Sequence, residues 1–279
     1  MGDIRDEIFG SLAGTRVTAS IIADGDGVLA GASSAAEAAE ELGLRLEAML
    51  ADGDDIAAGD EIARFSGTPK QMAVAEDTLM GFMAKPSGIA AAARGFVSET
   101  GNKPRVVCGA WKKMPKVLKG ALRRAVVIGG ASCRISSEPF LYLDKNYTRM
   151  FGGIRETLDA VADMKGYLKV VQLKGRHKDI VSEASEAVLS GASILFIDTG
   201  RLEDVGAVVG ALAERGQRGG VEIAFGGGVG LEQVAELMDL DVDILDIGRN
   251  ILDAPLLDMR FEIVAVDHSE QRGREDDAV

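Results

Sequence analysis

The amino-acid sequence predicts an α/β protein whose larger domain has parallel strands joined by helices, preceded by a small α+β domain. Three observations lead to this fold class. From residue 105 onward, short β-like runs alternate with helical patterns, which is typical of a parallel sheet with helical crossovers. The first hundred residues lack this alternation and are rich in alanine. The chain has 279 residues, of which 47% are hydrophobic, and this is enough for a full core and more than one domain.

The first domain is expected to combine helices with short strands. Residues 33–50 and 71–97 are Ala-rich helical stretches, and residues 16–23 and 60–67 are short β-like runs. Glycines and acids lie between the runs, as they do in small sandwich-like domains. We therefore expect an α+β sandwich domain over residues 1–104, whose last helix leads into the second domain.

The second domain is expected to begin with the first of six β-like runs. They are RVVCGA (105–110), FLYLD (140–144), LKVVQL (168–173), SILFID (193–198), VEIAF (221–225) and DILDIG (243–248). The clearest helical pattern covers residues 202–216, where apolar residues recur at i, i+3, i+4, i+7 and i+8. This alternation fits either an open doubly wound sheet or a closed barrel.

Composition and charge argue against several classes of function. The formal net charge is −13, which disfavours nucleic acid as the main partner. No apolar run reaches the roughly 18 residues of a membrane span, and the charged N-terminus MGDIRDEIF is unlike a signal peptide. We expect a cytoplasmic protein without a membrane partner. The two cysteines and two histidines predict neither a disulfide framework nor a His-rich metal site.

Glycine clusters at two strand ends are candidate phosphate-binding loops. The stretch AFGGGVG places Gly226, Gly227 and Gly228 between a β-like run and a helical run, where backbone N–H groups can approach an anion. In βα barrels phosphate often binds in the loops after the last two strands, which adds Gly248 and Arg249. The alternative is that the glycines only form a turn.

A basic stretch covers residues 101–137, which contain nine Lys and Arg residues and no acid. Four of the nine fit the solvated face of a helix, namely Lys116, Lys119, Arg123 and Arg124. Lys112 and Arg134 lie beside β-like runs and are better candidates for an anion site.

Seven motifs follow one another in an order and spacing found in one enzyme family. KPSGIAAAARGFV resembles that family's LSGIAT helix, GAWKKMP its DTRKTTP, GGASCR its GGVNHR and LDKN its IKDN. FIDT resembles its LDN strand end, AFGGGV its SGGI phosphate loop, and DILDIGRNILDAPLLDM its stretch ending in LD. Over most of its length the chain thus resembles the quinolinate phosphoribosyltransferases, also called nicotinate-nucleotide pyrophosphorylases (carboxylating).

The resemblance implies an incomplete TIM-like α/β barrel over residues 105–266, and we expect the remaining residues, 267–279, to form a polar acidic tail. It implies homodimers, or multiples of dimers, in which the N-terminal domain of one subunit caps the barrel of the other. It further implies transfer of phosphoribose from phosphoribosyl pyrophosphate, with Mg²⁺, to a ring nitrogen of a small aromatic acid, as in NAD biosynthesis.

Lys112 and Asp198 are the candidate catalytic residues under this resemblance. Pyrophosphate leaves the sugar through a positively charged state, so the protein must place a carboxylate near the sugar and cations near the leaving group. Asp198 ends a strand and fits the first requirement, and its alternative role is to cap the helix that follows. No protein side chain is assigned as a metal ligand, and Asp198 is the one residue considered to act through Mg²⁺.

The chain departs from the family where the acceptor would bind. Trp111 replaces the arginine of TRKT, Cys133 the histidine of NHR, and Asp144 the lysine of KDN. Asp77 replaces the arginine of a glutamate–arginine pair in the helix before LSGIAT. A pyridine dicarboxylate needs several cations, and this pocket has too few. The candidate substrate-binding residues are Trp111, Lys113, Arg134, Asp144, Lys145 and Gln172.

Three functions fit these observations. The first, which we predict, is a phosphoribosyltransferase for an aromatic acceptor with fewer carboxylates than quinolinate, stacked on Trp111. The second is quinolinate transfer itself, forming nicotinate mononucleotide with release of CO₂, with Lys113 or Lys145 compensating for the lost cations. The third is a barrel that binds a phosphorylated sugar without catalysis.

Overall fold

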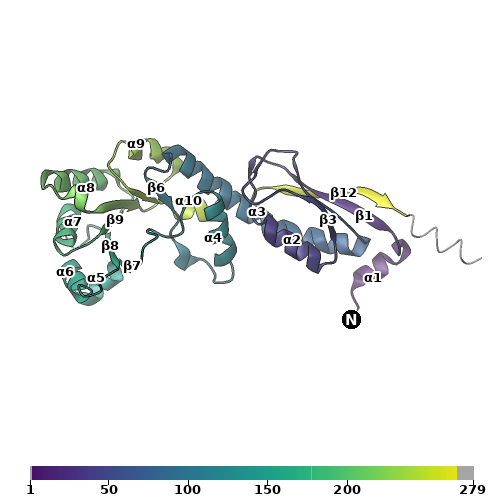
Figure 1. Ribbon diagram of the computed structural model, residues 1–279, viewed down its shortest axis with the longest axis horizontal. Helices are drawn as coiled ribbons and strands as arrows, with labels where there is room; N and C mark the ends of the chain where they lie inside the picture. Colours follow the sequence, from purple (N-terminus) through teal and green to yellow (C-terminus); the bar gives the residue numbers. More distant parts are fainter. Residues whose placement is uncertain (1, 177, 269–279) are drawn as a thin grey trace, which may run out of the picture. The chain divides into compact units, whose positions relative to one another are not determined.

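The computed structural model describes residues 2–176 and 178–268 (Figure 1). Within these residues the chain forms two compact units. The described part of the first unit consists of residues 2–91, 120–129 and 254–268, and that of the second unit of residues 92–119, 130–176 and 178–253. The predicted tail lies outside the described residues from position 269 onward, as does residue 177.

An antiparallel sheet with the strand order β12-β1-β5-β3 organises the first unit. The strands are β1 (Arg16–Ala23), β3 (Arg45–Met49), β5 (Glu61–Gly67) and β12 (Met259–Asp267), and β2 (Gly27–Val28) pairs separately with β4 (Asp55–Ile56). The helical segments of this part of the chain are α1 (Ile4–Ile8), η1 (Gly10–Leu12), α2 (Ala32–Glu41), α3 (Pro69–Thr100) and α4 (Lys119–Ile128). Ile21, Ile62 and Phe65 are fully buried in its core, together with alanines from α2.

The predicted helix over residues 33–50 is wrong in its second half. α2 ends at Glu41, and Gly43 then has a φ of +73°, a left-handed conformation that glycine adopts without strain. The chain continues as β3, which pairs antiparallel with β5. The sequence RLEAM has good helix formers, so here the pairing with a neighbouring strand overrides local propensity.

β12 is a strand that the sequence did not predict. It pairs antiparallel with β1 over its whole length, so residues up to Asp267 contribute to the sheet of the first unit. The expected barrel domain extended to residue 266, whereas the second unit ends at Asp253.

Six parallel strands form the sheet of the second unit, in the order β6-β11-β10-β9-β8-β7. They are β6 (Arg105–Val107), β7 (Phe140–Leu143), β8 (Leu168–Leu173), β9 (Ile194–Asp198), β10 (Glu222–Gly226) and β11 (Ile244–Asp246). Between them lie η2 (Trp111–Lys113), α5 (Lys145–Phe151), α6 (Ile154–Ala160), α7 (Ile180–Leu189), α8 (Leu202–Glu214), η3 (Arg218–Gly220), η4 (Leu231–Gln233) and α9 (Val234–Met238), and α10 (Arg249–Leu252) follows the last strand. β6 and β7 stand at the two ends of this order. The prediction of an incomplete TIM-like barrel after a small sheet domain is therefore confirmed.

The inward-facing side chains of the parallel strands are apolar in the middle of the sheet and polar at its carboxyl end. Inward-facing apolar residues form one buried cluster: Val107, Val170, Ile194, Phe196, Ala224 and Ile244. Because side chains alternate with a period of two, the next inward positions toward the carboxyl ends are Gln172, Asp198, Gly226 and Asp246. Polar side chains are thus concentrated at the carboxyl end of the sheet.

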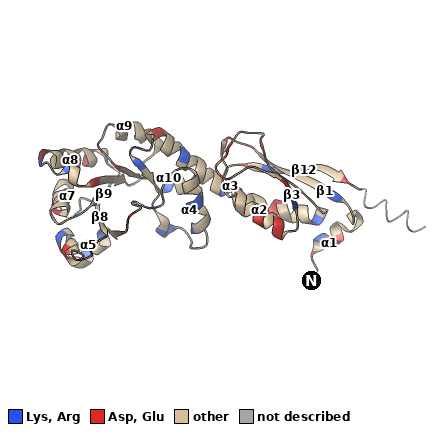
Figure 2. Cartoon of the chain, viewed as in Figure 1, with Lys and Arg blue, Asp and Glu red and all other residues tan. Residues whose placement is uncertain are grey.

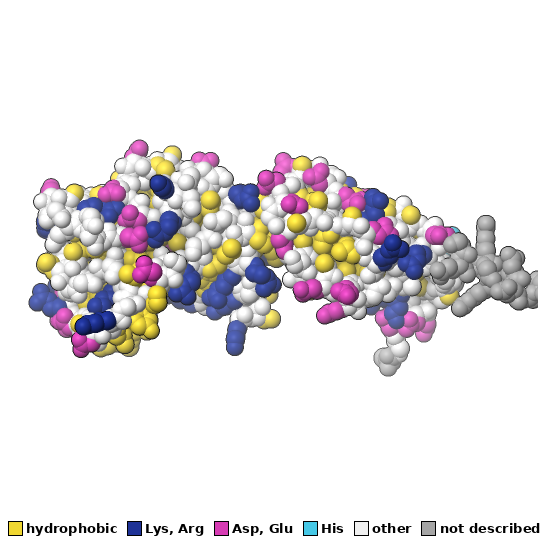
Figure 3. All heavy atoms as spheres, viewed as in Figure 1, with side chains coloured by type: hydrophobic (Ala, Val, Ile, Leu, Met, Phe, Trp, Pro, Cys, Tyr) yellow, Lys and Arg dark blue, Asp and Glu magenta, His cyan; other side chains and the backbone are white. Residues whose placement is uncertain are grey.

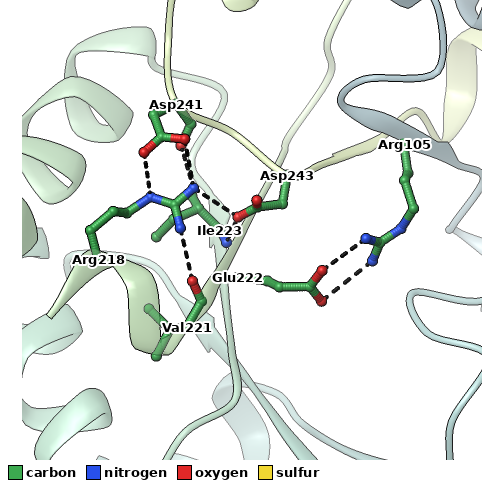
Figure 4. Close-up of polar contacts among 7 residues, drawn as sticks. All are labelled: Arg105, Arg218, Val221, Glu222, Ile223, Asp241 and Asp243. Atoms are coloured by element: carbon green, nitrogen blue, oxygen red, sulfur yellow. Dashed lines mark hydrogen bonds and ion pairs between the residues drawn. The ribbon is translucent and has the colours of Figure 1, made fainter.

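The amino ends of the strands carry charges that pair with one another (Figure 4). Arg105, at the start of β6, donates to Glu222 at the start of β10, with an Nη1–Oε1 distance of 2.8 Å. Arg218 donates through Nη2 to Asp241 and Asp243, each at 2.9 Å. These arginines are engaged by carboxylates, so the loops at the carboxyl ends are the better place for an anionic ligand.

The exposed basic side chains of α4 agree with the prediction of a solvated helix face. Arg123 and Arg124 are exposed, whereas Leu122, Ala125 and Val126 are buried. Figure 2 shows Lys and Arg positions along α4, and Figure 3 shows their side chains gathered in that region. No helix in the described ranges has the length and apolarity that crossing a bilayer requires, α3 included.

Candidate functional site

A cavity of about 420 Å³ opens at the carboxyl ends of the parallel strands. Its wall comes from the carboxyl ends of all six parallel strands and the loops that follow them. The lining residues are Ala110, Lys112, Lys113, Tyr142, Gln172, Phe196, Asp198, Gly227, Gly228, Asp246, Gly248, Arg249 and Asn250. Eight of the residues predicted from the sequence are among them, and we refer to this space as the phosphate cavity.

Two carboxylates stand at the same level of the sheet, one on each side of a glycine. Gly226 of β10 is the register partner of Asp198 on β9 and of Asp246 on β11. A Cβ atom at Gly226 would lie 2.9 Å from the Phe196 ring and 3.2 Å from the Asp246 Cβ atom. The lack of a side chain at Gly226 therefore leaves room for Phe196 and Asp246. Gly226 is itself buried, while Gly227 and Gly228 line the cavity.

Asp198 is held by two polar side chains from β8 and the residues after it. The Nζ atom of Lys174 lies 2.7 Å from the Asp198 Oδ2 atom, and Gln172 donates to the same oxygen. The backbone N–H of Lys145 donates to the Gln172 Oε1 atom over 3.0 Å, which fixes the orientation of that amide. Asp198 does not cap the next helix, since the N-cap residue of α8 is Arg201.

A buried glutamate on α7 fixes the loop that carries Lys174. Glu183 is 5% exposed, and its carboxylate accepts hydrogen bonds from the backbone N–H groups of Lys174, Gly175 and Arg176 at 2.9, 2.8 and 3.1 Å. Gly175 has a φ of +59°, which lets the chain turn around this carboxylate. The position of the Lys174 ammonium group near Asp198 therefore depends on Glu183.

Asp246 lines the phosphate cavity, and one oxygen of its carboxylate is buried. Its Oδ1 atom is inaccessible to solvent and has no hydrogen-bond partner among the described residues. A Cβ atom at Gly109 would lie 2.5 Å from both carboxylate oxygens, so only glycine leaves room for them. Burial raises the pKa of Asp246 to about 6, the backbone N–H of Gly109 opposes the rise, and the charge of Asp198 adds to it.

The loops after β9, β10 and β11 approach one another through glycines. A Cβ atom at Gly227 would lie 2.5 Å from the backbone nitrogen of Gly200, whereas one at Gly228 would meet no atom within 4 Å. The side chain of Asn250 donates to the Val229 carbonyl over 2.7 Å and joins two of the loops. Within the described ranges, the N–H groups of Gly227 and Gly228 have no hydrogen-bond acceptor. These free donors suit an anion.

A second cavity, of about 230 Å³, adjoins the first and is mainly apolar. We call it the apolar cavity. It is lined by Val107, Cys108, Gly109, Ala110, Trp111, Lys112, Cys133, Arg134, Ile135, Phe140, Tyr142, Phe196 and Asp246. Lys112 and Asp246 belong to both cavities. Burial raises the pKa of the Cys108 thiol above its usual range, so this side chain adds no charge at neutral pH.

Arg134 lies in the apolar cavity and not in the phosphate cavity. Its guanidinium carbon is 5.1 Å from the centre of the Phe140 ring, and its Nε atom donates to the Ser136 carbonyl over 3.3 Å. Phe140 is the first residue of β7, so the Arg134 guanidinium lies toward the amino end of the sheet. Lys112 is therefore the predicted cation that both cavities share.

Three of the residues singled out from the sequence lie elsewhere. Asp144 is the N-cap residue of α5, where it accepts from the N–H groups of Asn146 and Tyr147. Lys145 lines a third cavity, of about 320 Å³, which it shares with Gln172 and Lys174. Asp77 belongs to the first unit, where its carboxylate lies 3.3 Å from the Nη2 atom of Arg5.

The sequence reasoning missed Lys174 and Asp246. Asp246 ends the β-like run DILD, and an acid at the carboxyl end of a parallel strand was a signal that could have been used. Lys174 follows β8 by one residue and gave no comparable signal, because its contact with Asp198 depends on how the loop turns.

Comparison with known proteins identifies the family. The model for the C-terminal domain of quinolinate phosphoribosyl transferase matches residues 89–262, and the model for the N-terminal domain matches residues 3–87. The chain belongs to the quinolinate phosphoribosyl transferase family. This confirms the family and the enzyme class, a pentosyltransferase, that the sequence motifs predicted.

Relatives from two archaea align over nearly the whole chain. A probable nicotinate-nucleotide pyrophosphorylase (carboxylating) of Archaeoglobus fulgidus is 28% identical over 250 residues, which is 89% of this chain and 95% of the relative. The corresponding protein of Methanothermobacter thermautotrophicus is 26% identical over 252 residues, with 90% and 89% coverage.

Solved structures share the fold. NadC from Streptococcus pyogenes superimposes with a TM-score of 0.78 at 21% identity, covering 96% of this chain and 91% of that one. Nicotinate-nucleotide pyrophosphorylase from Pyrococcus furiosus gives a TM-score of 0.82 at 21% identity, with 94% and 73% coverage. At this identity the likeness supports the fold, and the choice of acceptor has to be argued from the side chains.

Proposed function

We propose that this family member transfers phosphoribose from phosphoribosyl pyrophosphate to an aromatic, pyridine-like acid with fewer carboxylates than quinolinate. One observation carries the proposal. The cavity next to the phosphate loops is walled by Trp111, Phe140, Tyr142 and Phe196, and the charged side chains that line it are Lys112, Arg134 and Asp246. A flat ring fits such walls, one carboxylate on that ring can pair with Lys112, and a second would face the negative charge of Asp246.

The electrostatic cost can be approximated from Coulomb's law. Two like charges roughly 4 Å apart at an effective dielectric constant near 20 repel by on the order of 4 kcal/mol before screening. If half of this survives, a dianionic acceptor loses more than about a factor of ten in affinity for each opposing carboxylate. Lys112 lies at the boundary of the two cavities and can balance one carboxylate of the acceptor.

The residues of the phosphate cavity have roles in the proposed reaction. The N–H groups of Gly227 and Gly228 bind phosphate oxygens, and Lys112 with Arg249 offsets the charge of the leaving pyrophosphate. Asp198 stabilises the positive charge that develops on the sugar, and Lys174 and Gln172 keep its carboxylate in place.

Magnesium is proposed as the cofactor because pyrophosphate is its usual ligand in such reactions. In the described part of the chain, no three His, Cys, Asp or Glu side chains are grouped to hold a metal. This fits a Mg²⁺ ion that is held mainly by pyrophosphate oxygens and water, and it would neutralise charge on the leaving group. We assign no protein ligand to it.

Quinolinate itself is the second candidate acceptor, favoured by the names of the archaeal relatives. In that case Lys113, which lines the phosphate cavity, would have to balance the second carboxylate. A third candidate is a phosphosugar-binding protein without catalysis. Release of pyrophosphate from phosphoribosyl pyrophosphate, measured with a panel of aromatic acids, separates this candidate from the first two.

The deciding experiment is steady-state kinetics with quinolinate and with aromatic monocarboxylates. We expect the monocarboxylates to be preferred, and the variant Trp111→Arg, which adds a cation to the wall of the apolar cavity, to shift the preference toward quinolinate. A wild-type kcat/KM for quinolinate of about 10⁴ M⁻¹s⁻¹ or more would instead identify quinolinate as the acceptor.

A further inference from the structure

Asp246 lies where the phosphate cavity and the apolar cavity meet, and one of its oxygens has no donor. The Oδ1 atom is inaccessible to solvent, and no described residue donates a hydrogen bond to it. Buried polar atoms in folded proteins nearly always have a partner. An unpaired carboxylate oxygen between two cavities therefore indicates a donor that a bound ligand supplies.

The surroundings of Asp246 favour an N–H group of an aromatic ring as this donor. On the apolar side the cavity is walled by Trp111, Phe140, Tyr142 and Phe196, which leave room for a flat ring and supply no cation next to Oδ1. A pyridine nitrogen presents a lone pair, and a lone pair facing a carboxylate oxygen is repelled. A ring nitrogen that carries hydrogen has the opposite preference.

We infer that Asp246 accepts a proton from a ring N–H of the acceptor, which makes the acceptor an azole-type aromatic acid in place of the pyridine-like acid named in the proposed function. The inference rests on the proposed phosphoribosyl transfer. The bond from C1′ to the pyrophosphate oxygen breaks, and its electron pair leaves with pyrophosphate. A lone pair of the ring then forms the N–C1′ bond, and the N–H proton passes to the Asp246 carboxylate, which releases it after the product has left.

The groups that face Asp246 fit a role as proton acceptor. Asp198 faces it from β9 and Tyr142 from β7, and Cys108 follows β6. Cys133, Arg134 and Lys112 also line the cavities. The pKa of Asp246, about 6, leaves the carboxylate ionised at pH 7 and close enough to neutrality to accept and release a proton.

The test compares two ligands that differ in a single N–H group. Imidazole-4-carboxylate carries a ring N–H, and its N-methyl isomers do not. Binding is measured by calorimetry with Mg²⁺ and pyrophosphate present, and turnover is measured as pyrophosphate released from phosphoribosyl pyrophosphate. We expect the wild type to bind imidazole-4-carboxylate at least tenfold more tightly than either methylated isomer.

Two variants separate binding from proton transfer. Asp246→Leu removes the acceptor oxygen, so the preference for the N–H ligand should disappear. Asp246→Asn still accepts a hydrogen bond but is a poor base, so kcat should fall at least a hundredfold with little change in KM. Asp239→Asn changes an exposed aspartate after α9 in the same unit and serves as the control, with unchanged kcat and KM. Retained pyrophosphate binding shows that each variant is folded.

The possible outcomes are distinct. Equal binding of the methylated and unmethylated ligands, absence of binding by both, or full turnover in Asp246→Asn would each overturn the inference. If nicotinate or another pyridine acid is used equally well by the wild type and Asp246→Asn, phosphoribosyl transfer stands and only the role of Asp246 is lost. If no acid supports pyrophosphate release while the N–H preference in binding holds, the proposed catalysis fails instead.

Discussion

Replacing Glu183 by Gln should destabilise the second unit and loosen the loop that carries Lys174. The Glu183 carboxylate accepts hydrogen bonds from three backbone N–H groups, with N–O distances of 2.8–3.1 Å. A glutamine amide has one oxygen, and its NH₂ group would face donors. At least one N–H group is then left without an acceptor in a largely buried site, at about 1–3 kcal/mol for each such group. We expect a loss of about 2–3 kcal/mol.

Urea unfolding followed by circular dichroism measures this loss, and a matched variant on the same helix serves as the control. Glu186→Gln removes an ion pair with Lys178, whose Nζ–Oε2 distance is 2.6 Å and whose lysine is exposed. Such pairs contribute at most about 1 kcal/mol. Equal midpoints for the two variants would refute the view that the Glu183 carboxylate organises the loop. Because the chain has two units, the comparison uses the same transition in both variants.

Three further predictions concern other parts of the molecule. The pKa of Asp246 in the folded protein lies above the ordinary value of 3.8, so the free energy of unfolding should fall as pH rises from 4 to 6. The variant Asp246→Asn should therefore be more stable than the wild type by up to about 3 kcal/mol at pH 7.5 and by little at pH 4, as measured by urea unfolding. Gly227→Ala should weaken binding of phosphoribosyl pyrophosphate at least tenfold, about 1.4 kcal/mol. The effect should be larger than that of Gly228→Ala, because only a side chain at Gly227 forces the loop after β9 to move. Equal affinities of the two variants in calorimetry would contradict this prediction. Light scattering at micromolar concentration should show a dimer or a multiple of it, with Glu76 and Asp77 near the partner's pocket, and a monomer would exclude this arrangement.

The parts of the fold that were predictable from the sequence are those in which local pattern and tertiary structure agree. Residues 202–216 have helical periodicity and form α8, and the run SILFID contains β9. Residues 45–49 have good helix formers but pair with β5, because an edge of the sheet was available to them. β12 could not be assigned to the first unit because its partner, β1, lies more than two hundred residues away in the sequence.

The candidate site was predictable where a residue's role depends on its position at a strand end. The glycines after β10 and the carboxylate of Asp198 are examples, since parallel strands bring their carboxyl ends to one edge of the sheet. Asp144 also follows a strand, but its carboxylate accepts hydrogen bonds from N–H groups in the first turn of α5. A sequence pattern does not distinguish these uses, because both need an acid directly after a strand.

The pairing of β12 with β1 has a consequence for the synthesis of the chain. β1 is formed within the first 23 residues, but one of its neighbours, β12, ends at Asp267. During translation the sheet of the first unit therefore lacks a strand until β12 has left the ribosome, and the β1 edge stays open to other strands. The second unit, which ends at Asp253, is complete earlier. Nascent chains from which residues up to about 255 have left the ribosome should thus contain a folded barrel and an unfinished first sheet, and this stage of synthesis is the one most exposed to aggregation.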